Sequence, residues 1–539
     1  MIRKNIYKWH RISSLIIALP VVLWAASGFM HPIMTTIRPS VATQWLMPKA
    51  IDSNKIKMPL QNALQQNHLD SFTNFRLVHI DTNWFYQVQR GKEKEPIYLS
   101  TSNGKLLPQG EWLYAQYLAK QFLEGQEKNK VDTINKIETI VSSSAHDCCD
   151  AATTCVLKNS KGSKVRDVST LTNFNDEYKS VNKLLPVHRV AFDKADGIRV
   201  YVETTQDRFA FAMDNKRAVF DKIFRLFHTW SWLEFLGKGK LVIEMLLTAL
   251  AFLTSIMGLY IFFITKGKKV NGNSTVKARN NHRYVAVSIS LFTLMFTFSG
   301  CYHALSKLTD DTRNSFYDEH WFASSGTSFN FEQLQATVKK PLNNISIVSI
   351  NNQTYWQVNA KKEEQGLGNK KGNKQQEVKG KDLMKAKEVA APSAIYINTN
   401  DYSMLEQGET KYANYLATKF SKHQPNEIQK TLAITKFEDE YGFVNKRLPV
   451  FKVSYATNSN ERYYVETASG KLSLRVDDKD VVEGYSFALL HKHEFMAWAG
   501  KSVKDISTMF WAMAQIVLVV FGFILYFKMR KREKGIASN

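Results

Sequence analysis

Four long runs of apolar residues stand out in the hydropathy pattern of the chain. An α-helix needs about twenty mostly apolar residues to cross the 30 Å hydrocarbon core of a bilayer, and each run meets that length. The stretches between them, 38–240 and 307–505, combine short β-like runs with helical stretches and predict α+β domains. We therefore predict membrane-spanning helices at residues 12–37, 241–265, 284–306 and 506–527.

The short segments that flank these helices are rich in lysine and arginine. Such residues collect in the cytoplasmic segments of membrane proteins. We therefore predict that residues 1–11, 266–283 and 528–539 are cytoplasmic and that both large domains lie outside the cytoplasm. The first apolar run is too long for a cleaved signal peptide, so we interpret it as a retained membrane anchor.

The second half of the chain repeats the first. Residues 83–88 (NWFYQV) are similar to 353–358 (QTYWQV), and 199–204 (RVYVET) are similar to 462–467 (RYYVET). Each half thus contains a helix, a domain and a second helix, and we expect a pseudo-twofold axis along the membrane normal. The predicted fold class is a membrane α-helical protein with four transmembrane helices in duplicated two-helix halves and two extracytoplasmic α+β domains.

Two segments have no counterpart in the other half. Residues 361–391 are rich in lysine, glutamine, glutamate and glycine, and with so few apolar residues we expect a mobile loop. Residues 141–168 contain His146, Cys148, Cys149 and Cys155. On the oxidising side of the membrane we expect a disulfide between Cys155 and one of the other two cysteines, with a metal or thiol-redox role as the alternative.

Histidines occupy equivalent positions in the two halves. His10 opens the first apolar helix and His31 ends it, and His282 and His303 do the same in the third helix. The 21 residues between them correspond to roughly 31 Å of α-helix, so one histidine lies near each membrane surface. The repeats add a third pair ahead of the second and fourth helices, which gives six positions: His10, His31, His228, His282, His303 and His491.

This pattern suggests haem binding. Haem iron takes axial imidazoles, helical bundles build such sites from facing helices, and ionisable groups beside a membrane tend to be functional. We therefore predict that the six histidines are haem-iron ligands, with a structural hydrogen-bonding role as the alternative for each one. Two pairings fit: the histidines that open the helices hold one haem and outer histidines hold another, or each half holds an outer haem, His31 with His228 and His303 with His491.

Two arginines accompany the histidine pattern. Arg11 and Arg283 directly follow the histidines that open the first and third helices. Their charges can pair with haem propionates or with anionic lipid headgroups, so we expect both to contribute to haem binding or to contact membrane lipid. For His146 and His188, which have no histidine counterpart in the other half, we expect surface roles.

Two further positions near the membrane differ between the halves. His493 replaces Trp230 of the first half, and it could line a substrate surface or act as an interfacial anchor. Glu244 aligns with Ser507 and lies in the first turn of its span. We expect a solvated interfacial carboxylate at this position, with a proton relay as the alternative.

The formal net charge is +23, from 72 basic and 49 acidic residues. Many basic residues flank the membrane or lie in the lysine-rich insert, which disfavours binding to nucleic acid. No strand is followed by a G-x-G-x-x-G turn and no phosphate-binding loop is found, so no flavin, nicotinamide or nucleotide module is predicted. The cytoplasmic segments are too short for a donor domain, and we expect electrons from a quinol or a separate cytoplasmic donor.

Several of these features resemble one known family. Trp9, His10 and Arg11, the apolar helix with Pro20 and Trp24, the Ser-Gly pair at its far end and the repeated domains are similar to the PepSY-associated transmembrane family. The resemblance covers nearly the whole chain apart from the two inserts. This family includes haem-containing ferric-siderophore reductases of the bacterial inner membrane.

The resemblance implies two PepSY-like periplasmic domains, two haems of the b type and a place in the bacterial inner membrane. We therefore expect an oxidoreductase that passes electrons across the membrane to a periplasmic ferric siderophore. Reduction would release iron, because hard oxygen ligands suit Fe(III) better than Fe(II). The alternative is a non-enzymatic sensor or regulatory membrane protein whose PepSY-like domains bind peptides or proteins, while a transporter is disfavoured by the scarcity of charged groups and broken helices in the spans.

Overall fold

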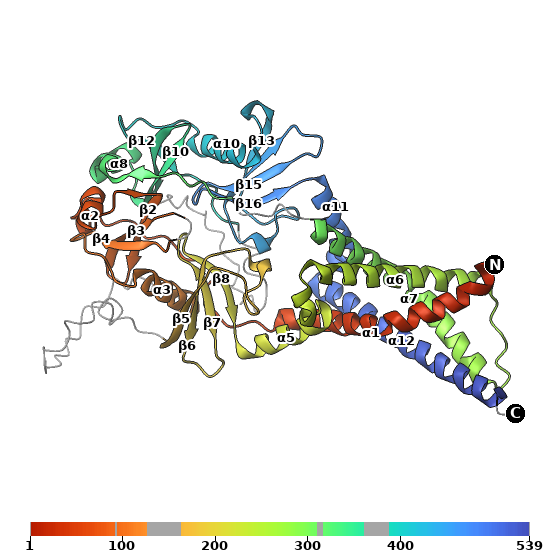
Figure 1. Cartoon of the computed structure of the whole chain (residues 1–539). Helices are drawn as coiled ribbons and strands as arrows, with labels where there is room; N and C mark the ends of the chain where they lie inside the picture. Colours follow the sequence, from red (N-terminus) through yellow and green to blue (C-terminus); the bar gives the residue numbers. More distant parts are fainter. Residues whose placement is uncertain (1, 92–93, 127–162, 310–315, 361–387, 538–539) are drawn as a thin grey trace, which may run out of the picture. The chain divides into compact units, whose positions relative to one another are not determined.

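The computed structural model describes residues 2–91, 94–126, 163–309, 316–360 and 388–537, which belong to two compact units (Figure 1). The membrane unit consists of residues 1–38, 216–313 and 478–539, and the soluble unit consists of residues 39–215 and 314–477. Residues 141–162 of the cysteine-containing insert, with His146 and its three cysteines, and residues 361–387 of the lysine-rich insert lie outside the described residues. The expectations for these segments stay predictions.

The membrane unit is built on long helices. Within the described ranges, four helices are long and apolar enough to cross a membrane: α1 (Ile2–Thr36), α6 (Lys238–Ile264), α7 (Ser274–Thr309) and α12 (Lys501–Ala537) (Figure 1). They confirm the prediction of a multi-pass membrane protein. Helices α1, α7 and α12 continue well past the predicted spans. Hydropathy identifies only the part of a helix that lies in the hydrocarbon core. The lysine and arginine residues beyond that core also favour helix, so the helices extend into the flanking segments.

The four long helices pack in a ring. Helix α1 contacts α6 and α12, and α7 contacts the same two helices, so α1 and α7 face each other across the bundle. The Ser-Gly pairs lie at close contacts. A β-carbon at Gly28 of α1 would lie 3.8 Å from Cβ of Ala512 in α12, and one at Gly300 of α7 would lie 3.6 Å from Cγ2 of Thr248 in α6. Small residues at these positions let the backbones approach, as is common between membrane helices.

Short helices lead into α6 and α12. In the first half α5 (Asn215–His228) is followed by the 3-10 turn η3 (Ser231–Leu236). In the second half α11 (Asp478–Ser486) continues as the π-helical turn η7 (Phe487–His491) and is followed by η8 (Glu494–Ala499). In both halves the last turn ends on a glycine with positive φ, a conformation that glycine adopts without strain, and the chain then turns directly into the long helix.

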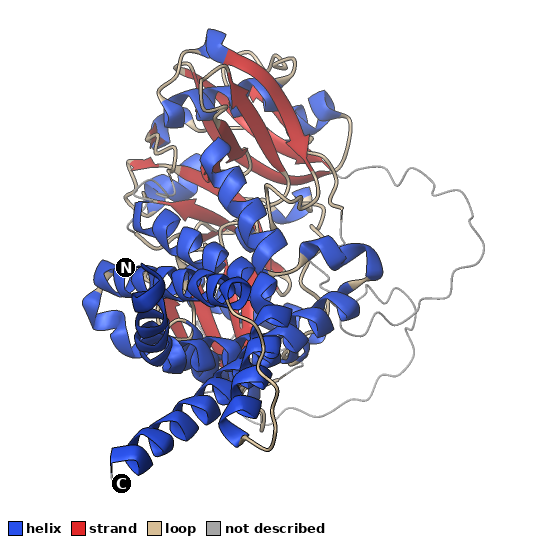
Figure 2. Ribbon diagram, turned by 90° about the vertical axis from the view of Figure 1, so that its right-hand side faces the viewer, coloured by secondary structure: helices blue, strands red, loops and turns tan. Residues whose placement is uncertain are grey.

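The soluble unit contains small sheets covered by helices (Figure 2). In the sheets of three and four strands, consecutive strands are antiparallel neighbours. The first half has the sheets β2 (Asn74–Ile80), β3 (Asn83–Gln89), β4 (Ile97–Ser100) and β5 (Val165–Leu171), β6 (Val187–Phe192), β7 (Arg199–Glu203), β8 (Arg208–Met213). The second half has the sheets β10 (Leu342–Ile350), β11 (Gln353–Ala360), β12 (Ile395–Asn398) and β13 (Ile428–Ile434), β14 (Val450–Tyr455), β15 (Arg462–Glu466), β16 (Lys471–Val476).

Helices pack on these sheets in the same way in both halves. Helix α3 (Gly110–Glu124) packs on the sheet β5–β8, and α10 (Gly408–Ser421) packs on β13–β16. The remaining elements are α2 (Leu60–Gln66), α8 (Phe331–Val338), the pair β1 (Ser71–Phe72) and β9 (Phe322–Ala323), and the 3-10 turns η1 (Ser53–Lys55), η2 (Ser180–Asn182), η4 (Ser324–Gly326), η5 (Pro425–Glu427) and η6 (Phe443–Asn445). The structure thus confirms a membrane α-helical protein with α+β domains.

The two halves of the soluble unit exchange hydrogen bonds reciprocally. Nζ of Lys446 donates to Oδ1 of Asn182 at 2.6 Å. The repeat equivalents bond in the opposite direction, and Nζ of Lys183 donates to Oδ1 of Asn445 at 2.7 Å. One hydrophobic cluster also contains side chains from both halves. The halves therefore share one hydrophobic cluster in this unit, and each half also has a cluster of its own.

Candidate functional site

Four of the six predicted histidines come together at one end of the bundle. His31 lies near the C-terminal end of α1, and His303 lies near that of α7. His228 is the last residue of α5, and His491 is the last residue of η7. His491 interacts electrostatically with each of the other three. We call these four residues the four-histidine cluster.

The rings of the four-histidine cluster form an array with two phenylalanines. At its centre the ring centres of His228 and His491 lie 6.2 Å apart, with an angle of 77° between the ring planes. This contact therefore joins a histidine of the first half to a histidine of the second half. Within each half a phenyl ring contacts both histidines: Phe224 lies 4.7 Å from His228 and 5.4 Å from His31, and Phe487 lies 4.8 Å from His491 and 4.6 Å from His303.

The spacing of His228 and His491 fits two axial ligands of one iron. Metal–imidazole bonds of about 2.0 Å place the ring centres of two such ligands roughly 6 Å apart, which agrees with the observed 6.2 Å. The same-half pairing of His31 with His228 instead has the ring of Phe224 against both partners. The cross-half pair is the better fit, and it belongs to the first of the two pairings that the sequence left open.

Buried serines lie behind the central pair. Ser27 has no exposed surface, and its Oγ lies 3.0 Å from Nδ1 of His228. Ser299 is its equivalent in α7. Oγ of Ser299 and Nδ1 of His491 are both buried and find no hydrogen-bond partner among the described residues. A partner on Nδ1 fixes the ring and directs Nε2 to a metal, so the first half holds its histidine more firmly than the second.

The two central imidazoles are neutral at neutral pH. Burial, reinforced by His31, Lys307 and His303, lowers the pKa of His228 to about 4. Burial, reinforced by the other histidines of the cluster, lowers the pKa of His491 to about 3. Iron binds imidazole in its neutral form, so protons do not compete for these nitrogens.

The outer members of the four-histidine cluster differ from each other. Nδ1 of His303 is hydrogen-bonded to Oε1 of Glu483. In the first half Phe220 occupies the position of Glu483, and His31 is an exposed residue. A carboxylate on one ring nitrogen makes the other nitrogen a stronger ligand. His303 is therefore better prepared than His31 to bind a cation.

His10 and His282 lie near the other end of the bundle, on the two helices that face each other. Nδ1 of His10 lies 3.2 Å from the backbone oxygen of Thr254 in α6, and a β-carbon at Gly258 would lie 3.2 Å from its Cε1. His282 lies in the same way against Gly522 of α12, where a β-carbon would be 3.6 Å from Cε1. Nδ1 of His282 is buried without a hydrogen-bond partner in the part of the chain that the structure describes. His282 is close enough to His10 to interact with it electrostatically.

The structure separates the two predicted arginines. Nη2 of Arg283 donates to the backbone oxygens of Phe262, at 2.7 Å, and Thr265, at the C-terminal end of α6. Its guanidinium carbon also lies 4.5 Å from the ring centre of Phe262. A cation at this end of a helix is favourable, so Arg283 joins α6 to α7. Arg11 is exposed on α1, and a contribution of either arginine to haem binding stays a prediction.

His493 is a buried histidine that the sequence did not place among the ligands. Its side chain has no exposed surface, and its Nδ1 lies 3.1 Å from Oγ of Ser507. Its Nε2 is buried and has no hydrogen-bond partner within the described ranges, and burial lowers its pKa to about 4. An interfacial anchor would keep its polar tip in water, so a binding role fits better. In the sequence, the only indication of such a role was that histidine at position 493 stands where the first half has Trp230. Three rings surround it: Phe292 at 5.4 Å, Phe296 at 5.2 Å and Phe495 at 5.3 Å.

The prediction of a surface role for His188 is wrong. Its side chain is 2 % exposed, and its Nε2 lies 2.7 Å from Oε1 of Glu111. The other oxygen of Glu111 accepts a hydrogen bond from Tyr98 at 2.6 Å, and Nδ1 of His188 lies 3.2 Å from Oγ1 of Thr170. Strand β6 is buried at nearly every position, so no alternation marked an inward face. His188 is a structural residue of the first soluble domain.

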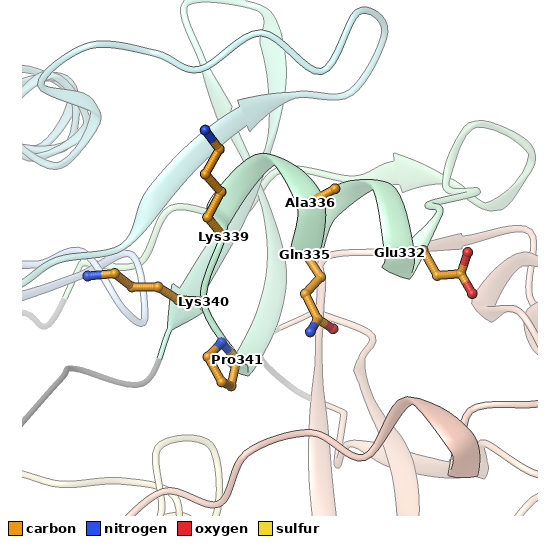
Figure 3. A pocket seen from close by; sticks show the side chains of 6 residues that line it. All are labelled: Glu332, Gln335, Ala336, Lys339, Lys340 and Pro341. Atoms are coloured by element: carbon orange, nitrogen blue, oxygen red, sulfur yellow. The ribbon is translucent and has the colours of Figure 1, made fainter.

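The described residues do not form a site that would hold a metal ion by protein side chains alone. Among the described residues, no group of three or more His, Cys, Asp or Glu side chains is arranged to hold a metal ion. A pocket of about 460 Å³ lies in the soluble unit, around the end of α8 (Figure 3). Its lining contains none of the predicted histidines and consists of Glu332, Gln335, Ala336, Lys339, Lys340 and Pro341.

No protein-family model matches the chain, and no curated protein matches it. A function for the chain therefore rests on the histidines and their surroundings.

Proposed function

We propose that the chain is a bacterial inner-membrane haem b reductase, similar to the PepSY-associated transmembrane proteins, that passes electrons across the membrane to periplasmic ferric siderophores. The observation that carries the proposal is the contact between His228 and His491, two neutral imidazoles from the two halves with ring centres 6.2 Å apart.

In this proposal His228 and His491 hold one haem, and His10 and His282 hold another. The two pairs lie toward opposite ends of helices long enough to cross a bilayer, so together they mark a route through it. Bound haem would supply the one-electron chemistry that these side chains lack.

The chain's own groups prepare the four imidazoles. Ser27 orients the ring of His228 through Nδ1, and the carbonyl of Thr254 orients that of His10. Gly258 keeps side-chain atoms away from His10, where any β-carbon would already be at 3.2 Å. A fixed ring loses less freedom when it binds, so these contacts favour ligation over a mobile histidine.

The distribution of basic residues supports the direction of electron flow. Lysine and arginine are abundant in the segments 1–11 and 266–283, beside His10 and His282, as expected for the cytoplasmic side. The four-histidine cluster then faces the periplasm, where a ferric siderophore is the substrate. Electrons come from a quinol or from a separate cytoplasmic protein.

The visible absorption spectrum of the purified full-length protein in detergent tests the proposal. We expect a Soret band, and after reduction with dithionite the sharp bands of a b-type haem with two histidine ligands. Addition of a ferric hydroxamate chelate should then reoxidise the protein. A folded but colourless protein from haem-replete cells would contradict the proposal and favour a PepSY-type sensor or binding protein.

A further inference from the structure

In each half, a side-chain ring that follows the short helix α5 or α11 packs beside a long membrane helix. The inserted residues are Trp230 in the first half and His493 in the second, and both have positive φ, 42° and 53°. The two halves build the same stack of three rings, and the stacks differ in whether the middle ring is tryptophan or histidine. The stacks are Trp24–Trp230–Trp232, with ring centres 5.0 and 5.8 Å apart, and Phe296–His493–Phe495, with ring centres 5.2 and 5.3 Å apart.

The middle ring is satisfied in the first half and unsatisfied in the second. Nε1 of Trp230 donates to the backbone oxygen of Phe227 at 3.1 Å. His493 is held at Nδ1 by Ser507, but its fully buried Nε2 meets no hydrogen-bond partner anywhere in the described residues. When Nδ1–H donates to the serine hydroxyl, Nε2 is left as an acceptor. A buried acceptor without a donor is costly, which indicates that a ligand supplies one.

The stack runs from the buried imidazole to the surface of the membrane unit. Phe296 precedes His303 in α7 by seven residues, so the stack begins roughly 10 Å deeper in the membrane than that histidine. Phe495 is 42 % exposed and forms the outer end of the stack, and Trp498, 85 % exposed, lies in the same turn. Exposed aromatic side chains next to membrane-spanning helices are typical of the lipid interface.

The stack also leads to the four-histidine cluster. Phe296 lies 5.2 Å from His493 and 5.6 Å from His491. One phenyl ring therefore connects the unsatisfied imidazole with a histidine that, in the proposed function, holds haem. An electron donor bound at His493 would lie next to its acceptor.

We propose that His493 forms a binding site for the head group of a membrane quinol and that its Nε2 accepts a hydrogen bond from a quinol hydroxyl. A quinol offers a flat ring for the aromatic stack, a hydroxyl donor for Nε2 and an apolar tail that stays in the lipid. Its oxidation to the quinone releases two protons and two electrons. Both protons would go to water outside the membrane, and haem held at His491 would accept the electrons one at a time, with a ferric chelate reoxidising it between the two transfers.

The inference rests on the proposed function for its electron acceptor. The four-histidine cluster would then receive electrons from a quinol in the lipid, in addition to electrons that a cytoplasmic donor delivers at His10 and His282. The binding site itself belongs to the second half alone, because Trp230 leaves no acceptor at the equivalent place.

Binding of decylubiquinol to the purified full-length protein, reduced beforehand with dithionite under anaerobic conditions and measured by isothermal titration calorimetry, tests the site without turnover. We expect saturable binding, weakened about tenfold in His493→Phe, because the ring remains while the acceptor is lost. His493→Gln keeps a polar group and should bind better than His493→Phe. Trp230→Phe, at the equivalent position of the first half, is the matched control and should bind like the wild type.

Reduction by decylubiquinol gives a second measurement. In His493→Phe it should be about tenfold slower, while dithionite still reduces the protein fully and the spectrum is unchanged. Absence of binding in the wild type, or equal binding in the wild type and His493→Phe, would overturn the quinol site whatever the haem content. A colourless protein that binds decylubiquinol through His493 would support the site and reject the haem function.

Discussion

Oγ of Ser27 lies 3.0 Å from Nδ1 of His228, although the two residues are 201 positions apart in the chain. The contact joins α1 to the end of α5. The equivalent atoms of Ser299 and His491 are buried without a hydrogen-bond partner in the described structure. The two ligands of the proposed central haem are thus oriented to different degrees.

Ser27→Ala is expected to weaken haem retention about tenfold, because the ring of His228 loses the group that fixes it. The rate of haem transfer to apomyoglobin measures this change. Ser299→Ala is the matched control, and its effect should be smaller. Equal effects of the two substitutions would show that the Ser27 contact does not orient His228.

Haem content separates the two pairings of the outer histidines. If His228 and His491 hold one of two haems, alanine at either position should remove about half of the bound haem. Alanine at His31 or His303 should leave the content unchanged. A pyridine haemochrome assay normalised to protein measures this. The control is His423→Ala, because His423 lies in the soluble unit, where its Nε2 is 3.3 Å from Oε2 of Glu461. Loss in all four variants would favour the same-half pairing.

His10→Ala or His282→Ala is expected to abolish reduction of ferric chelates by a cytoplasmic donor in membrane vesicles. The outer haem should remain reducible by dithionite, because its proposed ligands are distant in the bundle. Protein abundance in the membrane is the control, since a lost cofactor also destabilises the fold. Unchanged chelate reduction at normal abundance would restrict the redox path to the four-histidine cluster.

Lys446 is expected to make the stability of the soluble unit depend on pH. Burial lowers the pKa of its amino group from 10.5 to about 7. Between these values the unfolded state binds more protons, so the free energy of unfolding rises with pH by up to about 1.4 kcal/mol per unit. The cost of the buried charge is fully present below pH 7 and disappears toward pH 10.5.

Thermal unfolding of the full-length protein in detergent between pH 7 and pH 10 checks this expectation. Lys446→Met should reduce the rise in stability relative to the wild type. Lys183→Met, at the partly exposed repeat equivalent, is the matched control. If all three proteins showed the same pH dependence, a neutral Lys446 would be excluded.

Local patterns were sufficient for the long helices and for the members of the four-histidine cluster. Apolar runs identify spans because the bilayer fixes their length, and the duplication identified His228 and His491 as equivalents. The contact between these two residues could not be predicted from sequence. It depends on how α5 and η7 approach each other, which no local spacing encodes.

The sequence also could not predict which individual histidines are buried. His188 meets Glu111 across 77 positions of the chain, and a strand buried on both faces carries no alternation to mark its inner side. His493 lies in a turn whose positive φ brings its ring against α7. In both cases tertiary packing, and not periodicity, decides whether the imidazole meets water.

The crossed bonds between Lys446 and Asn182 and between Lys183 and Asn445 give the soluble unit the architecture of a dimer joined into one chain. Each half supplies the lysine and the asparagine that the other half requires, so recognition between them needs no covalent connection. Two fragments produced by a single cut of the chain within residues 266–283 should therefore reassemble. One half could then be varied while the other stays fixed, and the two halves already differ in this way at the equivalent positions Trp230 and His493.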